Sequence, residues 1–239
     1  MESNAATERS NNTHIAAAYE RLRADIVGAK LAPGSKLRIE ALKRQYELGP
    51  SPLREALNRL AAEGWVEHRE QRGFHVVGAD QARYAELLKA RIWADGSALR
   101  DSILHRDPAW EDRLVLALHH LLKVPRFVAA DSYDENPEWE RLHRAFHMTL
   151  LSNCTSSFIT EFCAHLYDHA HRYRQLALTV NRGQRKESGE HKAIAEAALA
   201  GEANQAVDLL CAHYQRTASI IGVAPEDVET EVPQQVRAA

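Results

Sequence analysis

The sequence predicts a mostly α-helical protein in two parts, an N-terminal winged helix-turn-helix followed by an all-α antiparallel helical bundle. Apolar residues recur at three- and four-residue spacing through most of the 239 residues. Strand-like runs occur only on the two sides of a turn that contains Arg72-Gly73. The chain is long enough to bury a sizeable core in each part.

Residues 14–78 carry the signals of three helices and a two-stranded wing. HIAAAYERLRADIVGAK has apolar residues at helical spacing and stops near Gly28. RIEALKRQYEL is a second, short helix closed by Gly49-Pro50. In the third, SPLREALNRLAAEG, we expect Ser51 as the N-cap, the following proline as the first helical residue and Gly64 as the stop. WVEHR and FHVV then form the wing.

Residues 79–222 read as helices throughout, after a linker at Gly78-Ala79. The helices are expected near 80–105, 108–124, 136–153, 156–178, 185–200 and 203–220. The two ends, 1–13 and 223–239, are polar and aperiodic, and we expect both to be disordered.

Composition narrows the class of protein. The chain has no run of about 18 apolar residues, so we expect no membrane span. Its polar N-terminus lacks a secretory signal, and its three scattered cysteines favour a reducing compartment, so we expect a cytoplasmic protein. Residues 14–78 hold eleven Lys/Arg against eight Asp/Glu, whereas the whole chain has a net charge of −3. A basic N-terminal part on an acidic remainder is typical of a DNA-binding domain joined to another domain.

The third helix and the wing offer side chains suited to double-stranded DNA. Arginine pairs with guanine edges and asparagine with adenine, and a glycine lets the backbone approach a phosphate. A solvated helix face and hairpin is the alternative interpretation. The DNA-binding candidates are Ser51, Arg54, Asn58, Arg59, Arg69, Arg72 and Gly73.

The stretch LHRAFH places His143 and His147 four residues apart, on one face of a helix. Neutral imidazoles are good ligands for transition metals, but two do not hold an ion tightly. Two ordinary histidines on an amphipathic helix remain the alternative, because His165 and His169 share the spacing. Later segments supply further candidate ligands, His191 and His213.

The sequence lacks the common catalytic motifs H-E-x-x-H and G-x-S-x-G, the P-loop and the dinucleotide-binding motif. We therefore expect no enzyme.

Two stretches of residues 14–78 resemble the GntR family of transcriptional regulators. They are Tyr19-x-x-Leu22-Arg23 with Leu31-Ala32-Pro33-Gly34, and PLREALNRLAAEG from Pro52 followed by Arg72-Gly73-Phe74. The resemblance implies that Arg54 contacts DNA from the recognition helix and Arg72-Gly73 from the wing tip. The family usually has Ser-Arg-Thr before this proline, whereas this chain has Gly49-Pro50-Ser51. A base-contacting arginine is therefore missing, which leaves the operator sequence undetermined.

The helical part resembles the FCD effector domain of the FadR subfamily, which implies a bound metal. Phe146-His147, His191 and His213 match the family's ligand pattern, while His143 stands where Asp is usual. The resemblance thus implies a four-histidine site for a divalent transition metal, zinc or nickel-like.

The same resemblance implies a small carboxylate effector near the metal. Arg91 matches an arginine that the family places near the effector, and Asp95 replaces its usual Glu. Tyr173 and Arg174 are further candidates, because guanidinium binds carboxylate bidentately. An ordinary surface ion pair is the alternative for either arginine.

Together these features predict a homodimeric, DNA-binding repressor that reads a palindromic operator and responds to a carboxylate or dicarboxylate. The motifs look most like the glutarate repressor subgroup. One alternative is a metal-dependent enzyme acting on a small organic acid, which turnover with metal would reveal. Another is a regulator with a purely structural metal, which thermal shifts with carboxylates would separate from the effector-controlled repressor.

Overall fold

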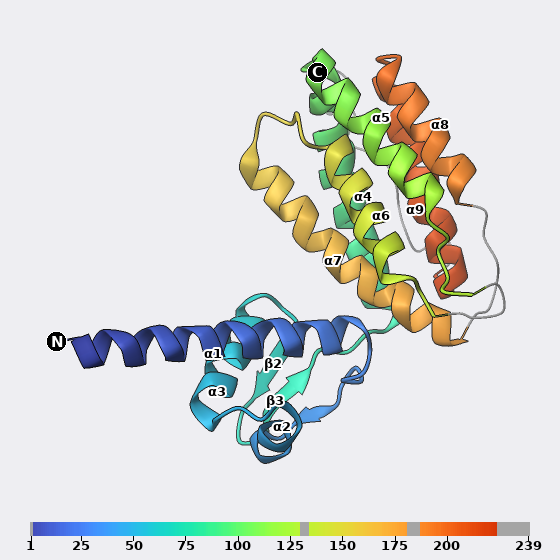
Figure 1. Ribbon diagram of the computed structural model, residues 1–239. Helices are drawn as coiled ribbons and strands as arrows, with labels where there is room; N and C mark the ends of the chain where they lie inside the picture. The colour runs from blue at the N-terminus through green and yellow to red at the C-terminus, as the bar shows by residue number, and fades with distance from the viewer. Residues whose placement is uncertain (1, 130–133, 181–186, 224–239) are drawn as a thin grey trace. The chain divides into compact units, whose positions relative to one another are not determined.

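The computed structural model describes residues 2–129, 134–180 and 187–223, and the chain divides into two compact units, Met1–Asp80 and Gln81–Ala239 (Figure 1). This division lies two residues after the boundary expected between Gly78 and Ala79. The tail expected to be disordered at 223–239 lies outside the described residues except for Val223, which is buried.

The first unit combines three helices with a small antiparallel sheet in the order β1-β3-β2. Its elements are α1 (Glu2–Val27), β1 (Lys36–Leu37), α2 (Ile39–Tyr46), α3 (Pro50–Ala62), β2 (Val66–Arg69) and β3 (Gly73–Val76). The sequence predicted the two strands of the wing but not β1, which has only two residues and so shows no alternation. Gly34 N–H donates to the carbonyl of Val76 and Val76 N–H to that of Ser35, each at 2.9 Å, which ties this loop to the wing.

The helix α1 begins at Glu2, where a disordered segment had been expected over 1–13. No glycine or proline precedes Gly28 in the sequence. The helix predicted from residue 14 onward can therefore continue back toward the N-terminus without a residue that breaks it.

The recognition helix α3 also begins earlier than the sequence suggested. Gly49 is its N-cap, in an extended conformation with φ −66° and ψ 163°, and Pro50 is the first helical residue. Proline suits this position because its missing N–H would have no partner in the first turn. Ser51, expected as the N-cap, therefore lies inside the first turn of α3.

A single apolar cluster holds the first unit together. Leu22 and Ile26 of α1 pack with Leu53 and Leu57 of α3 and with Trp65, and all five are fully buried. Each such side chain contributes about 1.5–3 kcal/mol of burial. The core therefore fixes α3 from its inner face and leaves its outer face to solvent.

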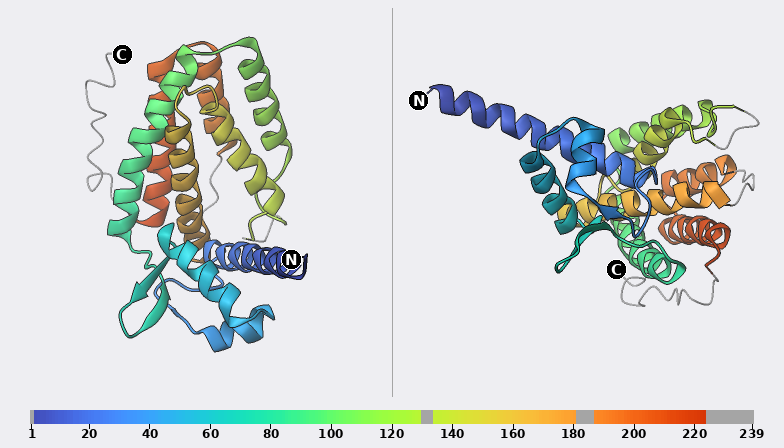
Figure 2. Two further views of the ribbon diagram at one scale, coloured as in Figure 1. Left: turned by 90° about the vertical axis from the view of Figure 1, so that its left-hand side faces the viewer. Right: turned by 90° about the horizontal axis from the view of Figure 1, so that it is seen from below.

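The second unit is an all-α bundle, in which α4 packs against α7 and α9, and α5 packs against α6 and α8 (Figure 2). The helices are α4 (Gln81–Leu104), α5 (Pro108–Lys123), α6 (Pro137–Leu150), α7 (Ser157–Val180), α8 (Ser188–Leu199) and α9 (Ala203–Ile221). The carboxylate of Asp101 accepts from Thr155 N–H just before α7, and Tyr84 contacts Tyr173 near the other end, so α4 and α7 are antiparallel. Within the described residues, no helix combines the length and the apolarity needed to cross a membrane.

Side-chain caps fix the starts of two of these helices. The Asp107 carboxylate accepts from Trp110 N–H at 2.7 Å, and the Asn136 side chain accepts from Glu138 N–H at 3.0 Å. Each cap is followed by a proline in the first helical turn. The second cap sets the start of α6, the helix that carries the first two histidines of the site.

Candidate functional site

The outer face of α3 and the wing carry the predicted DNA-binding residues of the first unit. Their side chains are exposed, apart from Gly73, which is half-buried and holds a φ of +78° at the wing tip. Two of the four arginines are engaged within the unit. Arg59 lies 4.0 Å from the centre of the Tyr19 ring and pairs with Glu63, and Arg69 pairs with Glu67. Exposed pairs of this kind contribute about 0–1 kcal/mol, so a phosphate can replace them.

Arg54 on α3 and Arg72 on the wing are the cations best placed for an external partner. Both are exposed, and within the described part of the chain neither forms an ion pair. Asn58 lies four residues after Arg54, on the same face of α3, and is also exposed. This face can therefore present a guanidinium and an amide together to the edges of base pairs.

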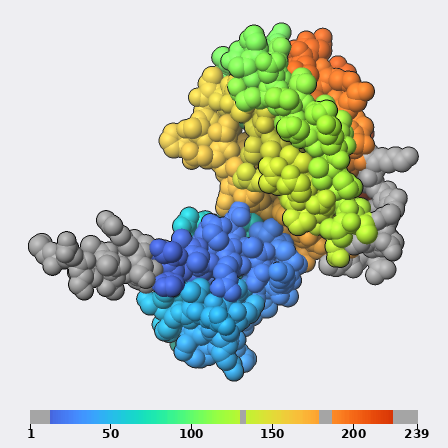
Figure 3. Space-filling view, in the orientation of Figure 1, coloured from blue at the N-terminus to red at the C-terminus, as the bar shows by residue number. Residues whose placement is uncertain are grey.

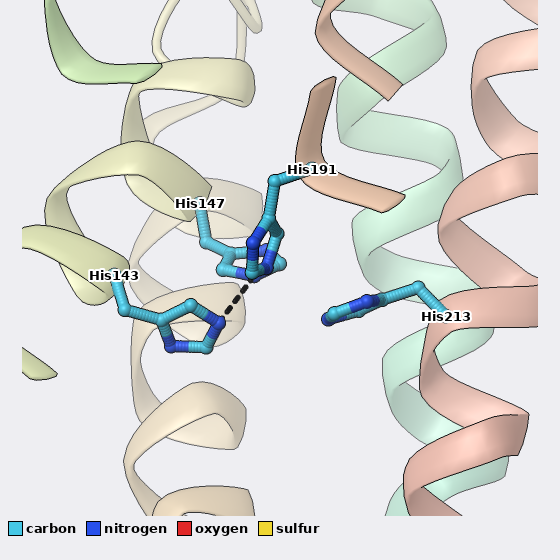
Figure 4. A group of neighbouring side chains, drawn as sticks. All are labelled: His143, His147, His191 and His213. Carbon is cyan, nitrogen blue, oxygen red and sulfur yellow. Dashed lines mark hydrogen bonds between the residues drawn. The ribbon is translucent and has the colours of Figure 1, made fainter. Parts of the chain in front are cut away.

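Four histidines converge in the interior of the bundle from three helices (Figure 4). His143 and His147 come from α6, His191 from α8 and His213 from α9, and all four are buried. One ligand atom from each lies within 4.8 Å of those of the other three. The Nε2 atoms of His143 and His147 are 3.1 Å apart. The sequence had placed only the two α6 histidines together by spacing, and the structure brings all four to one point.

Hydrogen bonds behind the cluster decide which ring nitrogens face inward. The Tyr167 hydroxyl donates to Glu140 at 2.9 Å, so the Nδ1–H of His143 is the donor in its 2.6 Å bond to that hydroxyl oxygen. The Nδ1–H of His213 donates to the Glu190 carboxylate at 2.8 Å. Both rings therefore keep an Nε2 lone pair for an ion, as outer hydrogen bonds do in metal sites.

Burial holds the His143 and His147 imidazoles in the neutral form that binds metal. The pKa of His143 is well below its usual value because of burial and, next, the nearby Arg174 guanidinium. Burial, followed by the neighbouring His143, lowers the pKa of His147 in the same way. Four imidazole ligands suit zinc, nickel or another transition ion, whereas magnesium and calcium prefer oxygen ligands. The residues present thus fit the metal that the sequence resemblance implied.

Two buried arginines share a cavity with the histidines. Arg91 on α4 pairs with Asp95 at 3.2 Å, and Arg174 on α7 pairs with Glu140 at 2.9 Å. Buried guanidinium groups are strong donors to carboxylates. The lining of the cavity consists of Tyr84, Arg91, Trp139, His143, His147, Tyr167, Arg174, Glu187, His213, Tyr214 and Thr217.

The other predicted effector residues lie outside this lining. Asp95 sits behind Arg91, where one carboxylate oxygen accepts from Arg91 and from the Tyr214 hydroxyl at 2.7 Å, so it orients the arginine. Tyr173 packs against Tyr84, with ring centres 4.8 Å apart, and does not line the cavity. His165 and His169 contact each other on α7 and belong to no group of three possible ligands among the described residues.

Several residues of the site were not predicted from the sequence. Trp139 stacks on the His143 ring, with centres 4.5 Å apart and planes at 13°. Tyr167 and Tyr214 lie under the two arginines, at 4.9 Å from Arg174 and 3.9 Å from Arg91. The sequence could have indicated Glu140, since it lies three residues before His143 on the same face of α6. It could not have indicated the aromatic residues, because buried aromatics at helical spacing are common in any core.

Comparisons with known proteins agree with this division of the chain. The model of bacterial regulatory proteins of the gntR family matches residues 15–76, and the FCD domain model matches residues 86–216. The HTH-type transcriptional regulator BphR of Paraburkholderia xenovorans (strain LB400) is 38% identical over 87% of this chain and 84% of its own length. The HTH-type transcriptional repressor GlaR of Escherichia coli (strain K12) is 29% identical over 85% of this chain and 93% of its own.

Solved structures share the fold. E. coli McbR/YncC superposes with a TM-score of 0.69 at 16% identity, covering 87% of this chain and 97% of that one. A putative GntR regulator from Rhodococcus sp. RHA1 superposes with a TM-score of 0.68 at 21% identity, covering 89% and 99%.

Proposed function

The chain belongs to the GntR family of bacterial regulatory proteins and carries an FCD domain, and we propose that it is a repressor whose DNA binding is controlled by a small carboxylate at a metal site. The family is one of DNA-binding transcriptional regulators with an effector-binding domain, not of enzymes. The metal, the carboxylate and the sign of regulation are the parts that we propose.

The observation that supports the metal and the carboxylate is that the candidate metal ligands and the candidate carboxylate-binding arginines lie at the same cavity. Three of the four clustered histidines line it beside Arg91 and Arg174, and His191 completes the cluster. His143, His147, His191 and His213 would hold a divalent transition ion, which supplies positive charge and an affinity for carboxylate oxygen. The two arginines would then bind the effector by charge-assisted hydrogen bonds.

On the DNA side, the proposal assigns base and phosphate contacts to the exposed face of α3 and the wing. Two copies of this unit in a homodimer would read a palindromic operator, because a two-fold protein demands a two-fold site. The effector can control this binding only if it favours one arrangement of the two DNA-binding units over another.

Exposed apolar side chains on the bundle support the homodimer. Phe158 and Phe162 lie four residues apart on one face of α7 and are 84% and 50% exposed, and the first turns of α7 stand at the edge of the bundle (Figures 1 and 3). Trp93 on the neighbouring helix α4 is 43% exposed. Two exposed phenylalanines on one helix face are typical of an interface, and we propose a second copy of the chain as the partner.

The relatives guide the sign of regulation but not the effector. GlaR is named a repressor, and this supports repression here. The glutarate repressor subgroup stays a prediction, since BphR, with the higher identity, carries a name that states no effector. A dicarboxylate is therefore one class to be tested among others.

Elemental analysis of the purified protein tests the metal site. We expect about one equivalent of a transition metal in the wild type and little in the variant His147→Ala, because three imidazoles bind the ion less tightly than four. The matched control is His169→Ala, which alters the other four-spaced pair and should leave the metal content unchanged. An unaltered metal content in His147→Ala would show that these histidines are not the ligands.

Fluorescence anisotropy tests the regulatory part, with labelled DNA from upstream of the protein's own gene. We expect salt-dependent binding that acetate, lactate, succinate or glutarate reverses in the zinc-loaded protein. If none of these acids changes either DNA binding or the melting temperature with zinc present, the metal is structural and the effector part of the proposal fails.

A further inference from the structure

Glu140 contacts both halves of the site, and we propose that it is a positioning residue whose negative charge strengthens metal binding and weakens carboxylate binding. This inference rests on the proposed function and names a control point within the same site. Glu140 does not line the cavity itself; its side chain, 13% exposed, lies behind the lining residues.

The first branch of contacts from Glu140, its hydrogen bonds with Arg174, leads to the carboxylate side of the cavity. One terminal nitrogen of Arg174 donates to both Glu140 oxygens, at 2.9 and 3.1 Å. An incoming carboxylate must share this guanidinium with Glu140 or displace it. The internal carboxylate therefore competes with the effector for the positive charge of the same guanidinium.

The second branch of contacts leads through the Tyr167 hydroxyl to His143, on the metal side. Tyr167 donates to Glu140 at 2.9 Å and accepts from His143, and Glu140 itself lies 3.6 Å from the Nδ1 atom of His143. Burial and the Glu140 carboxylate raise the pKa of Tyr167 well above its usual value, so it remains a hydrogen-bonded phenol. A carboxylate behind an imidazole makes that ring a better metal ligand.

Two neighbouring carboxylates each serve a single side of the site, and this sets Glu140 apart. Glu190 accepts from His213 and pairs with Arg216, which is 55% exposed and does not line the cavity. Asp95 accepts from Arg91 and Tyr214. The hydrogen bonds of Glu140 reach the metal side through Tyr167 and the carboxylate side through Arg174.

The variant Glu140→Gln tests the inference because the amide keeps the shape and removes the charge. Zinc affinity is measured by competition with a chelator in the absence of carboxylates. Succinate and glutarate affinities are measured by calorimetry on zinc-saturated protein. We expect zinc to bind about tenfold more weakly, a typical effect of removing an outer hydrogen-bond partner. We expect the dicarboxylates to bind about three- to tenfold more tightly, the size of one typical net hydrogen bond.

Two further variants separate the branches. Tyr167→Phe removes the hydroxyl that joins Glu140 to His143 and leaves the Arg174–Glu140 pair, so zinc affinity should fall without the gain in carboxylate affinity expected of Glu140→Gln. The matched control is Glu138→Gln, which removes an exposed carboxylate that pairs with Arg141 on the same helix, and it should change neither affinity.

In Glu140→Gln we expect zinc affinity to fall and dicarboxylate affinity to rise. These opposite changes distinguish a positioning role from a structural one. Weaker binding of both ligands, or no change in either, would overturn the inference. A wild-type protein that binds no zinc, or binds zinc but none of the carboxylates, would instead show that the proposed function is wrong. Failure of the inference is therefore measured in the Glu140→Gln variant, and failure of the proposed function is measured in the wild-type protein.

Discussion

Replacing Arg91 by methionine in the metal-free protein should lower the free energy of unfolding of the bundle by about 3–5 kcal/mol. The side chains of Arg91 and Asp95 are 5% and 1% exposed, and the N–O distance between them is 3.2 Å. Methionine fills much of the volume of the arginine but leaves the Asp95 carboxylate buried, with Tyr214 as its hydrogen-bond donor. The expected loss is therefore mainly the free energy of a buried charge without its counter-ion.

Urea unfolding measures this loss, followed by tryptophan fluorescence, because Trp110 and Trp139 are buried in the bundle. With a slope of about 1–3 kcal/mol per molar urea, the midpoint should move down by at least about 1 M. A chelator is present throughout, so that metal binding does not contribute to stability.

The double variant Arg91→Met/Asp95→Asn provides the control, because it removes both charges and keeps an amide oxygen for Tyr214. Its cost should be well below the sum of the two single variants. Additive costs, or a single-variant cost under about 1 kcal/mol, would refute the view of Arg91 and Asp95 as a coupled buried pair. The double variant should still bind zinc but should lose carboxylate binding, which separates the role of Arg91 in stability from its role with the effector.

Three other predictions follow from the structure. Arg54→Ala should weaken operator binding by about 1–3 kcal/mol in an anisotropy titration while the zinc content stays unchanged; a parallel loss of both would contradict the division of labour between the two units. The pKa values of His143 and His147 lie well below 6.5 in the folded metal-free protein, so the unfolded chain takes up more protons as the pH drops below about 6.5. The urea midpoint of the metal-free protein should accordingly be lower at pH 5.5 than at pH 7.5, and an equal or higher one would be inconsistent with these shifts. Phe162→Glu should convert the proposed dimer to a monomer in size-exclusion chromatography with light scattering; a dimer that persists would place the interface elsewhere.

The helices and the wing could be predicted from the sequence because each carries its own local signal. The apolar spacing, the prolines after Asp107 and Asn136, and the glycine after α3 all act within a few residues. The strand β1 could not, because two residues carry no periodicity and its pairing with β3 depends on a long-range contact. The early start of α3 was missed because two closely spaced prolines each suit a first helical position.

The site was predictable in part for the same reason. The α6 histidines share a helix face, so their proximity follows from the spacing alone, whereas His191 and His213 were assigned through resemblance. The packing of α8 and α9 decides their position, and no local pattern encodes it. Tyr173, predicted with Arg174 to bind the effector, does not line the cavity, because adjacent residues on a helix point about 100° apart and Arg174 is the one that faces it.

The position of His191 within α8 has a consequence for the motions of the bundle. This residue lies only three positions after Ser188, where the helix begins, while its partner ligands lie on α6 and α9. An ion held by all three helices would anchor the first turn of α8 to the interior. Amide hydrogen exchange in that turn should slow when zinc binds, so the opening rate of a helix end would report metal occupancy.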